Sequence, residues 1–453
     1  MKDDTRQPEQ LHKKTQVTGQ TRIGNSIVIP EINENVQIYE GDFQIIDHTT
    51  TLDLKGTIDF QWFPIPRTRF SGNFNPGTNS IALHFHRLKV VIDGQEVGTG
   101  TYSDPFNTPL EGYIKNITIG DVSKSVKSVN FSIPNLRKIS AETAERDEDG
   151  ARFHGRKITL EDDDYETTIL RLDDKDIDKM EVLAKNGGGY FISYVGECVS
   201  KKGTKTYNKI NEHFKCLDQF LSFMNGQRTS CIFLKGFKAG KEVWSDYSEK
   251  RIDPYIGVSS WASTFDQTSF NLTWKQFKSV WKNNGQLLNY ALHWYFESNK
   301  NSGLLEGSTI LVQAALETIC NWLIIEKLGI IRGQEAKNLS AQNKVRILCS
   351  TVGLSLDIPT ELKNLKNEKK TKTGKEPKFI DGPEALTEIR NALTHGNTQK
   401  YSSLTELSLQ SIFEAKQLGL WYVEVALLYA FNHRDIYFNR ITKKHVLPPY
   451  VSR

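Results

Sequence analysis

The hydrophobic pattern of this chain changes its period once, near Trp261, and this change constrains the fold more than any other feature. Before Trp261, apolar and polar residues alternate in short runs, which is typical of strands with one buried face. After it, apolar residues return every three or four positions, as in amphipathic helices. We therefore predict an α+β protein in which a β-rich N-terminal domain precedes an all-α helical bundle.

Turn signals separate the alternating runs of the β-rich part. Asp93-Gly94 is a two-residue hairpin signal between "KVVI" and "QEVG". We expect a sandwich or a curved sheet, with a helix over residues 208–226 that packs on it and stops at Gly226. The runs that predict strands are "TIDFQWF", "IALHFHRLKVVI", "VNFSI" and "GGYFISYVGE".

Four or five helices are predicted for the part of the chain after Trp261. The second of them, "TILVQAALETICNWLII", is apolar nearly all round and must be central. The others are a helix with a stripe from Phe277 to Tyr295, one that begins at Ser340, one from Pro383 to Gly396, and one that starts at the capping box Ser403-x-x-Glu406 and ends near Phe431.

A chain of 453 residues exceeds one ordinary core, because single domains usually hold roughly 100–200 residues. The first 25 residues are polar and without periodicity, so they predict a mobile tail. We expect a tail over 1–25, a β-rich sensing or regulatory domain over 26–262 and a helical domain over 263–453.

Charge and cysteine content limit which classes of function are possible for this chain. The 58 basic and 54 acidic residues give a net charge of +4, so any nucleic-acid surface must be local. The five cysteines are odd in number and widely spaced, which argues against a disulfide framework and a zinc site and favours the cytoplasm. The N-terminus lacks an apolar signal-peptide core and "GLWYVEVALLYAF" is short and broken by Glu424, so no membrane span is expected.

The segment "ALTEIRNALTHGN" carries the candidate chemistry, because Arg390, Asn391 and His395 crowd the end of one predicted helix. On an ideal helix Arg390 and His395 point about 140° apart, so either the helix distorts near Gly396 or two copies of the chain meet. The alternative is structural: Arg390 would pair with Glu317 and His395 would interact with the helix dipole. Polar residues also recur at four-residue steps on the apolar second helix, at Gln313, Glu317 and Asn321. Polar groups inside a bundle need a role there, which favours a catalytic function for the motif.

"RNALTHG" resembles the R-[polar]-x-x-x-H signature of HEPN domains, with Arg390, Asn391 and His395 at the three motif positions. The resemblance implies a compact helical bundle that acts as a metal-independent ribonuclease, usually as a homodimer. A β-rich region followed by such a bundle is similar to the ApeA class of abortive-infection proteins, which implies toxicity in phage-infected cells, a phage-derived trigger and transfer RNA as substrate. No metal and no cofactor are expected.

The residue types suit RNA cleavage by the 2′-hydroxyl, which needs a base, an acid and a cation for the phosphorane charge. His395 can serve as base or acid near neutral pH, and Arg390 offers a fork of donors to phosphoryl oxygens. Asn391 can orient the histidine or the phosphate, and Glu317 is a supporting residue. With one such histidine per chain, a dimer would supply both acid and base.

The lysine-rich segment "LKNLKNEKKTKTGKEPKF" directly precedes the motif helix and has no evident apolar face. It is either a solvated loop or a surface for substrate phosphates. The candidate RNA-binding residues are Lys363, Lys366, Lys369, Lys370, Lys372, Lys375 and Lys378.

Two further readings remain open. His84 and His86 in "LHFHRL" would share one side of a strand and could bind a metal, but no nearby Asp or Cys completes a site. The whole protein could instead be a non-catalytic binding protein whose bundle only dimerises.

Overall fold

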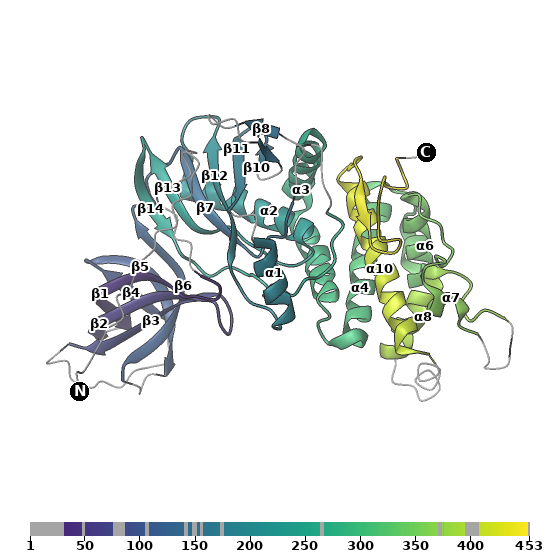
Figure 1. Ribbon diagram of the computed structural model, residues 1–453, viewed down its shortest axis with the longest axis horizontal. Helices are drawn as coiled ribbons and strands as arrows, with labels where there is room; N and C mark the ends of the chain where they lie inside the picture. Colours follow the sequence, from purple (N-terminus) through teal and green to yellow (C-terminus); the bar gives the residue numbers. More distant parts are fainter. Residues whose placement is uncertain are drawn as a thin grey trace, which may run out of the picture.

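The structure is a computed structural model (Figure 1). It describes residues 31–47, 50–75, 87–104, 108–139, 144–146, 152–154, 157–172, 176–262, 267–369, 374, 376–394 and 407–451. Along its long axis lie a β-barrel, an antiparallel sheet with helices against it, and a helical bundle (Figure 1). The expected α+β class, with a β-rich region followed by helices, is confirmed.

The first part of the chain is a barrel rather than the expected sandwich or curved sheet. Its strands run in the order β6-β3-β2-β1-β4-β5, and β5 also pairs with β6, which closes the ring. Closure depends on this pairing of strand edges, which the alternation of residues along each strand does not encode. The strands are β1 (Val36–Asp47), β2 (Thr50–Gln61), β3 (Arg67–Phe74), β4 (Leu88–Ile92), β5 (Gln95–Asp104) and β6 (Leu110–Gly120).

Alternating residues fill the barrel as their period of two predicts. Leu52, Leu54 and Ile58 of β2 are each no more than 1% exposed. The predicted hairpin at Asp93-Gly94 is confirmed: it joins β4 to β5 with φ of 50° and 74°.

β6 leaves the barrel and enters a second antiparallel sheet, where residues 118–120 pair with β14. The sheet continues β14-β13-β7-β12-β11-β10. The strands are β7 (Ser128–Pro134), β10 (Lys157–Glu161), β11 (Tyr165–Arg171), β12 (Ile192–Ser200), β13 (Ile232–Lys238) and β14 (Lys241–Asp246), and β8 (Ala144–Arg146) pairs separately with β9 (Arg152–His154).

The helix expected on this sheet is α2 (Tyr207–Asn225). Phe214 meets Phe131 of β7 edge to face at 5.1 Å, so the apolar face of α2 lies on the sheet. Gly226 ends the helix with a φ of 74° and donates its N–H to two carbonyls of the last turn, as predicted. A shorter helix, α1 (Asp176–Lys185), precedes β12.

The bundle is built around α4 (Leu304–Cys320), which contacts α3, α6, α8 and α10. The prediction that this segment is central is therefore confirmed. Together with the π-helix η1 (Asn321–Lys327) it is, among the described residues, the one helical stretch apolar and long enough to cross a membrane, with a mean hydropathy of 1.5. Because 61% of that stretch is buried inside the protein, its place in the core accounts for its composition. The other elements are α3 (Gln267–Asn299), α5 (Gly333–Asn338), α6 (Ala341–Thr351), α7 (Lys363–Asn367), α8 (Gly382–Thr394), α10 (Leu409–Ala430), β15 (Tyr437–Asn439) and β16 (Lys444–Val446).

Two helix starts were predicted from capping residues, one correctly and one wrongly. The third predicted helix is α6, whose cap Ser340 accepts a hydrogen bond from the Asn343 N–H, as expected. The last helix was predicted to start at Ser403-x-x-Glu406, and this is wrong: α10 begins at Leu409, where Ser408 accepts from the Ser411 N–H at 3.0 Å. The capping-box pattern lies outside the described residues.

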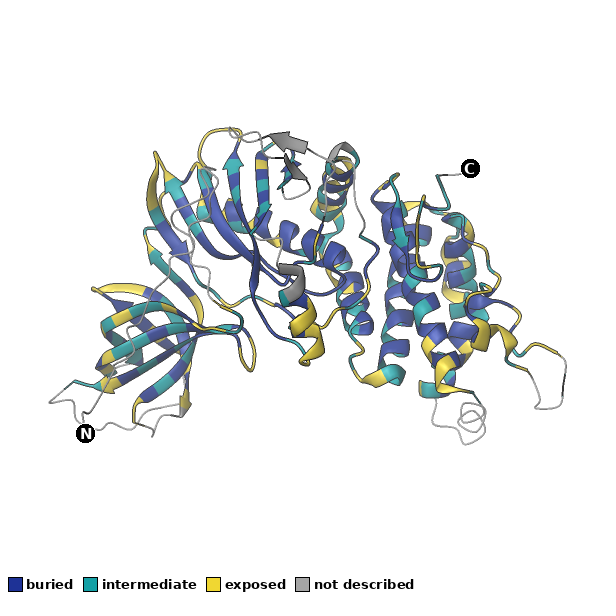
Figure 2. Ribbon diagram, viewed as in Figure 1, coloured by how far each residue is buried: buried dark blue, intermediate teal, exposed yellow. Residues whose placement is uncertain are grey.

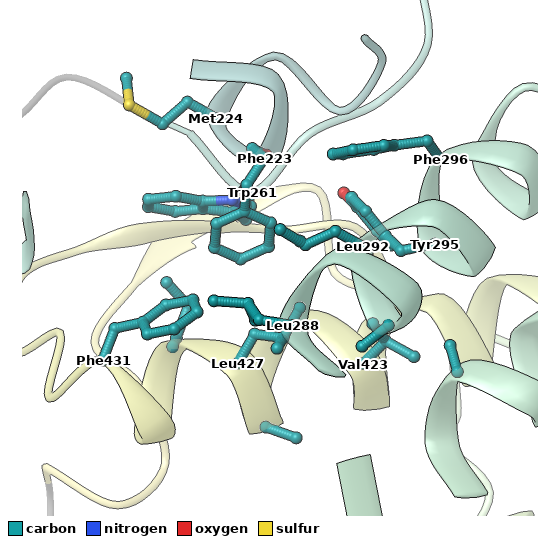
Figure 3. Close-up of a cluster of buried hydrophobic side chains, with 14 of the residues drawn as sticks. Phe223, Met224, Trp261, Leu288, Leu292, Tyr295, Phe296, Val423, Leu427 and Phe431 are labelled. Carbon is teal, nitrogen blue, oxygen red and sulfur yellow. Dashed lines mark hydrogen bonds between the residues drawn. The ribbon is translucent and has the colours of Figure 1, made fainter. Parts of the chain in front are cut away.

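The second sheet and the bundle share one hydrophobic core, which crosses the expected boundary between residues 262 and 263. In Figure 3, Phe223 of α2, Trp261, Leu292 of α3 and Leu427 and Phe431 of α10 face one another. Phe223 lies 5.0 Å from the Trp261 ring and 5.7 Å from that of Phe431. Buried residues fill the sheet, α4 and α10, whereas α7 at the edge of the bundle is largely exposed (Figure 2).

Candidate functional site

The motif helix α8 is held at its N-terminal end by charge and capping. Asp381 accepts the Glu384 N–H at 2.8 Å, which caps the helix, and the same carboxylate receives the Arg346 guanidinium of α6 at 2.6 and 3.2 Å. Because both contacts converge on Asp381, they set where α8 starts relative to α6.

Close helix packing fixes the middle of α8. The helical period predicts a buried stripe of Leu386, Ile389 and Leu393. Leu386 and Ile389 are at most 1% exposed, and Leu393 is partly buried against the same core. On α10, a Cβ added at Gly419 would lie 3.0 Å from Val312 of α4 and 3.1 Å from Leu386 of α8. The absence of a side chain at Gly419 therefore lets three helices meet closely beside the motif helix.

Arg390 lies near the C-terminal end of α8 and reaches across to the central helix. One terminal nitrogen, Nη2, donates to Glu317 Oε1 of α4 at 2.6 Å, and the other, Nη1, donates to Asn391 Oδ1 at 3.1 Å. The Arg390 and Glu317 side chains are 22% and 32% exposed, so the pair sits at the bundle surface in partial contact with solvent. The structure thus brings together three of the four expected site residues.

The polar row along α4 divides into a buried and an exposed end. Gln313 is fully buried and donates from Nε2 to Glu317 Oε1 at 3.3 Å, while its own Oε1 has no partner among the described residues. Asn321 is exposed and accepts from Lys344 of α6 at 3.2 Å. Glu317 is therefore the shared acceptor that links the interior of α4 to Arg390, as the four-residue spacing suggested.

The helix that carries this row changes geometry directly after it. From Asn321 to Lys327 the backbone is a π-helix, with the Leu328 N–H bonded to the Leu323 carbonyl at 3.0 Å. Single π-turns inside longer helices are frequent at functional sites, and this one begins one turn beyond Glu317. The sequence carried no signal for it.

His395, Gly396 and Asn397 lie outside the described residues, as do Lys370, Lys372 and Lys375. The described part of the motif ends at Thr394, whose hydroxyl donates to the Arg390 carbonyl at 3.0 Å.

The lysine-rich segment differs from its expected form, since its first part is the helix α7 and it has an apolar anchor. Leu365 is 1% exposed, and its N–H donates to Glu414 of α10 at 2.8 Å. Lys363 and Lys366 extend from α7 into solvent, Lys369 is exposed and Lys378 is half-buried. The polar contacts of Arg390 run to Glu317 and Asn391, so the structure brings none of these described lysines onto it.

Metal-binding residues do not gather in the described part of the chain, where no group of three or more His, Cys, Asp or Glu side chains could hold an ion. His84 and His86 lie outside it. All five cysteines are free and buried, and burial raises the pKa of the Cys320 thiol beside this site to about 11. At neutral pH that thiol is protonated and unreactive.

Residues 121–258 match the family described as YopA central domain, and residues 282–449 match the family described as YopA C-terminal domain. The first match begins where the barrel ends. A similar protein is the "SPbeta prophage-derived uncharacterized protein YopA" of Bacillus subtilis (strain 168), which is 23% identical over 91% of this chain and 93% of its own length. No solved structure matches the chain. By these comparisons the chain is similar to YopA along most of its length, in the sheet as well as in the bundle.

Proposed function

We propose that this protein is a metal-independent endoribonuclease of the HEPN type that acts in the cytoplasm as an effector of abortive infection. The observation that carries the proposal is the placement of Arg390 and Asn391, side by side and partly exposed at the end of α8, with Glu317 of the central helix orienting the guanidinium. An arginine held in one direction at a bundle surface, five residues before a histidine, suits a site for a phosphodiester.

The proposed reaction is an internal transesterification of RNA. The 2′-oxygen forms a bond to phosphorus while the bond from phosphorus to the 5′-oxygen breaks. A base takes the 2′-hydroxyl proton, and an acid returns a proton to the leaving 5′-oxygen. The products carry a 2′,3′-cyclic phosphate and a 5′-hydroxyl, so no water enters this step.

Arg390 would stabilise the charge that builds on the phosphoryl oxygens in the transition state. A guanidinium has five N–H donors, and the contacts to Glu317 and Asn391 use two of them. The remaining donors can face a phosphate without loss of the contacts that orient the group. Such preorganisation is what makes a fixed cation more effective than a mobile one.

His395 would serve as the base or the acid, and two chains would supply one each. We propose a homodimer whose two-fold axis passes beside α8, so that both copies of the motif line one cleft. The β-barrel and the adjacent sheet would restrain the bundle until a phage-derived trigger acts, and transfer RNA is the proposed substrate. The similar Bacillus subtilis protein is prophage-derived by its name; a resident prophage benefits when a competing phage is stopped, which suits this role.

A second candidate function is a binding protein whose bundle dimerises without catalysis. The Arg390–Glu317 contact favours it, because an ion pair of 2.6 Å between two helices also serves as a purely structural link. Under this reading Arg390 contributes to stability and nothing else.

The experiment that separates the two is sequencing of RNA ends in cells that express the wild-type chain or His395→Ala. We expect new 5′-hydroxyl ends with wild type and none with His395→Ala. His445→Ala, which changes an exposed histidine on β16, is the matched control and should cut like wild type. Equal RNA ends for wild type and His395→Ala would reject the nuclease and favour the binding protein.

A further inference from the structure

A polar groove lies away from the Arg390 motif, where the second sheet and α2 meet the helical bundle. It encloses about 710 Å³ between α2, the segments that precede β13 and follow β14, and the middle of α3. Pockets that hold small organic ligands commonly measure about 300–1,000 Å³ and often lie between domains. Its lining includes Lys215, Lys250 and Arg251 on one side and Trp281, Tyr290 and His293 of α3 on the other.

Three of these lining residues are cations with no ion-pair partner among the described residues: Lys215, Lys250 and Arg251. The acidic side chains of the groove are Glu249, which is exposed, and Asp218, which is buried and accepts the Cys231 N–H at 2.7 Å. Burial raises the pKa of Asp218 to about 6. Asp218 is still mostly ionised at pH 7, and Lys250 stabilises its charge. Counting Arg228, the lining has four basic side chains and two acidic ones, which favours an anionic ligand.

Aromatic rings accompany these cations. Tyr290 is 51% exposed, which is unusual for so large a side chain, and Trp281, nine residues earlier on the same helix, is half-buried. A Cβ at Gly285 would lie 3.3 Å from the Trp281 indole, so the glycine keeps a side chain away from that ring. The helix kinks at Asn284 between the two aromatics. Exposed rings next to unpaired cations suit a ligand that has both a planar base and phosphate groups.

The floor of the groove is rigid, because a buried polar network joins the sheet unit to α3. The Arg228 guanidinium donates to Glu297 at 2.5 Å and to His293 Nδ1 at 2.7 Å, and the Arg228 backbone N–H donates to Asp253 at 3.0 Å. An arginine has no acceptor, so Nδ1 must accept and the His293 ring must be neutral. Burial and the adjacent Arg228 lower the pKa of His293, which agrees with that state. A ligand seated here would contact both units at once.

We propose that this groove binds a nucleotide, with its base against Tyr290 and its phosphates among Lys215, Lys250 and Arg251. The inference uses no residue of the Arg390 motif and holds whether or not the bundle cleaves RNA. Binding across the junction would give the β-rich part a chemical signal to transmit to the helices.

The test is titration calorimetry of the full chain with ATP, GTP, inorganic tripolyphosphate and a single-stranded RNA ten-mer. We expect ATP or GTP to bind at micromolar to submillimolar concentrations. Lys250→Glu should weaken that binding at least about tenfold, because it replaces an attraction to phosphate by a repulsion. The matched control is Lys282→Glu, at an exposed lysine of α3 outside the groove, and it should bind like wild type.

A second variant tests how much the Tyr290 ring contributes to nucleotide binding. Tyr290→Ala removes an exposed side chain and should weaken the nucleotide about tenfold while leaving tripolyphosphate unchanged. The proposal is overturned if neither ATP nor GTP binds up to millimolar concentration, or if Lys250→Glu and Lys282→Glu bind alike. It is also overturned if the RNA ten-mer alone binds in a Lys250-dependent way, which would make the groove an RNA surface.

Discussion

The role of Arg390 can be decided by removing it and measuring stability and cleavage on the same preparation. Arg390→Ala breaks the 2.6 Å contact to Glu317 of α4 and the 3.1 Å contact to Asn391. If the arginine is only a structural link, its loss should appear in the free energy of unfolding. If it stabilises a transition state, its loss should appear in the cleavage rate.

The exposure of the Arg390–Glu317 pair limits how much it contributes to the free energy of unfolding. With side chains 22% and 32% exposed, solvent screens the attraction, and partly exposed pairs contribute up to about 1 kcal/mol. For a protein of this size that corresponds to a fall in Tm of about 1 °C. A donor that stabilises transition-state charge is worth more, about 2.7–4 kcal/mol, or a rate loss of about 100- to 1,000-fold. The two interpretations therefore differ in which measurement changes most.

The assay is thermal unfolding together with the initial rate of cleavage of a transfer RNA by the purified protein. Glu317→Ala should lower the free energy of unfolding by a similar amount. It should lower the cleavage rate less, by about tenfold, because Arg390 remains and only its orientation is lost. Lys278→Ala is the matched control, since Lys278 pairs with Asp162 at 2.8 Å and is 27% exposed, far along the chain from the motif. It should leave the rate unchanged and lower Tm at least as much as Arg390→Ala, because Asp162 is only 9% exposed and loses its cation.

One result would refute the reasoning. If Arg390→Ala and Lys278→Ala both lower Tm and both keep the wild-type rate, Arg390 has no part in cleavage. A Tm loss of more than about 3 °C for Arg390→Ala would also contradict the screening argument, because it would require a buried pair worth about 3–5 kcal/mol.

Three further predictions concern the same reaction. Cleavage should persist in EDTA and leave 2′,3′-cyclic phosphate ends, as read by end-labelling; loss of activity in EDTA with recovery in magnesium would contradict the mechanism. Replacing Lys369, Lys370 and Lys372 by alanine should weaken RNA binding and flatten its dependence on salt without moving the cut, as measured by filter binding at several salt concentrations, and an unchanged salt slope would make the segment a linker. A mixed dimer of Arg390→Ala and His395→Ala chains should regain activity over either mutant alone if one intact arginine and one intact histidine suffice, and should stay inactive if both histidines are needed. A stable monomeric variant that cuts at the wild-type rate per chain would exclude the shared site.

Local patterns predicted local structure well in this chain. Alternation marked the strands, Asp93-Gly94 marked a hairpin with both φ values positive, and Gly226 marked the end of α2. These signals act over a few residues, where sterics and hydrogen bonds are decided by near neighbours. The start of α10 was missed because several Ser and Glu residues precede it, and capping preference alone does not choose among Ser403 and Ser408.

The residues of the candidate site and one of its contacts, Arg390 with Glu317, could be predicted from the sequence, whereas its other contacts could not. The spacing of Arg390 and Asn391 was visible in the sequence, and Glu317 was named as a partner because a polar residue on an apolar helix needs one. The close packing permitted by Gly419, the cap at Asp381 and the buried Leu365–Glu414 contact all join segments that are distant in sequence. No local pattern reports such contacts.

By itself, the sequence determined the β-rich class of the first part and the helical class of the second, the central place of α4 and the residue types of the motif, because burial requires an apolar face with the period of its secondary structure. Tertiary structure alone decided that β5 pairs with β6 to close a barrel, that one core runs from the sheet into the bundle, and that three cations of the sheet region and two aromatic rings of α3 line one groove. Those outcomes depend on which strand edges and which helix faces meet, and many pairings satisfy the same local pattern. The chain adopts the pairing that buries its apolar faces together, and that choice is made by the whole fold at once.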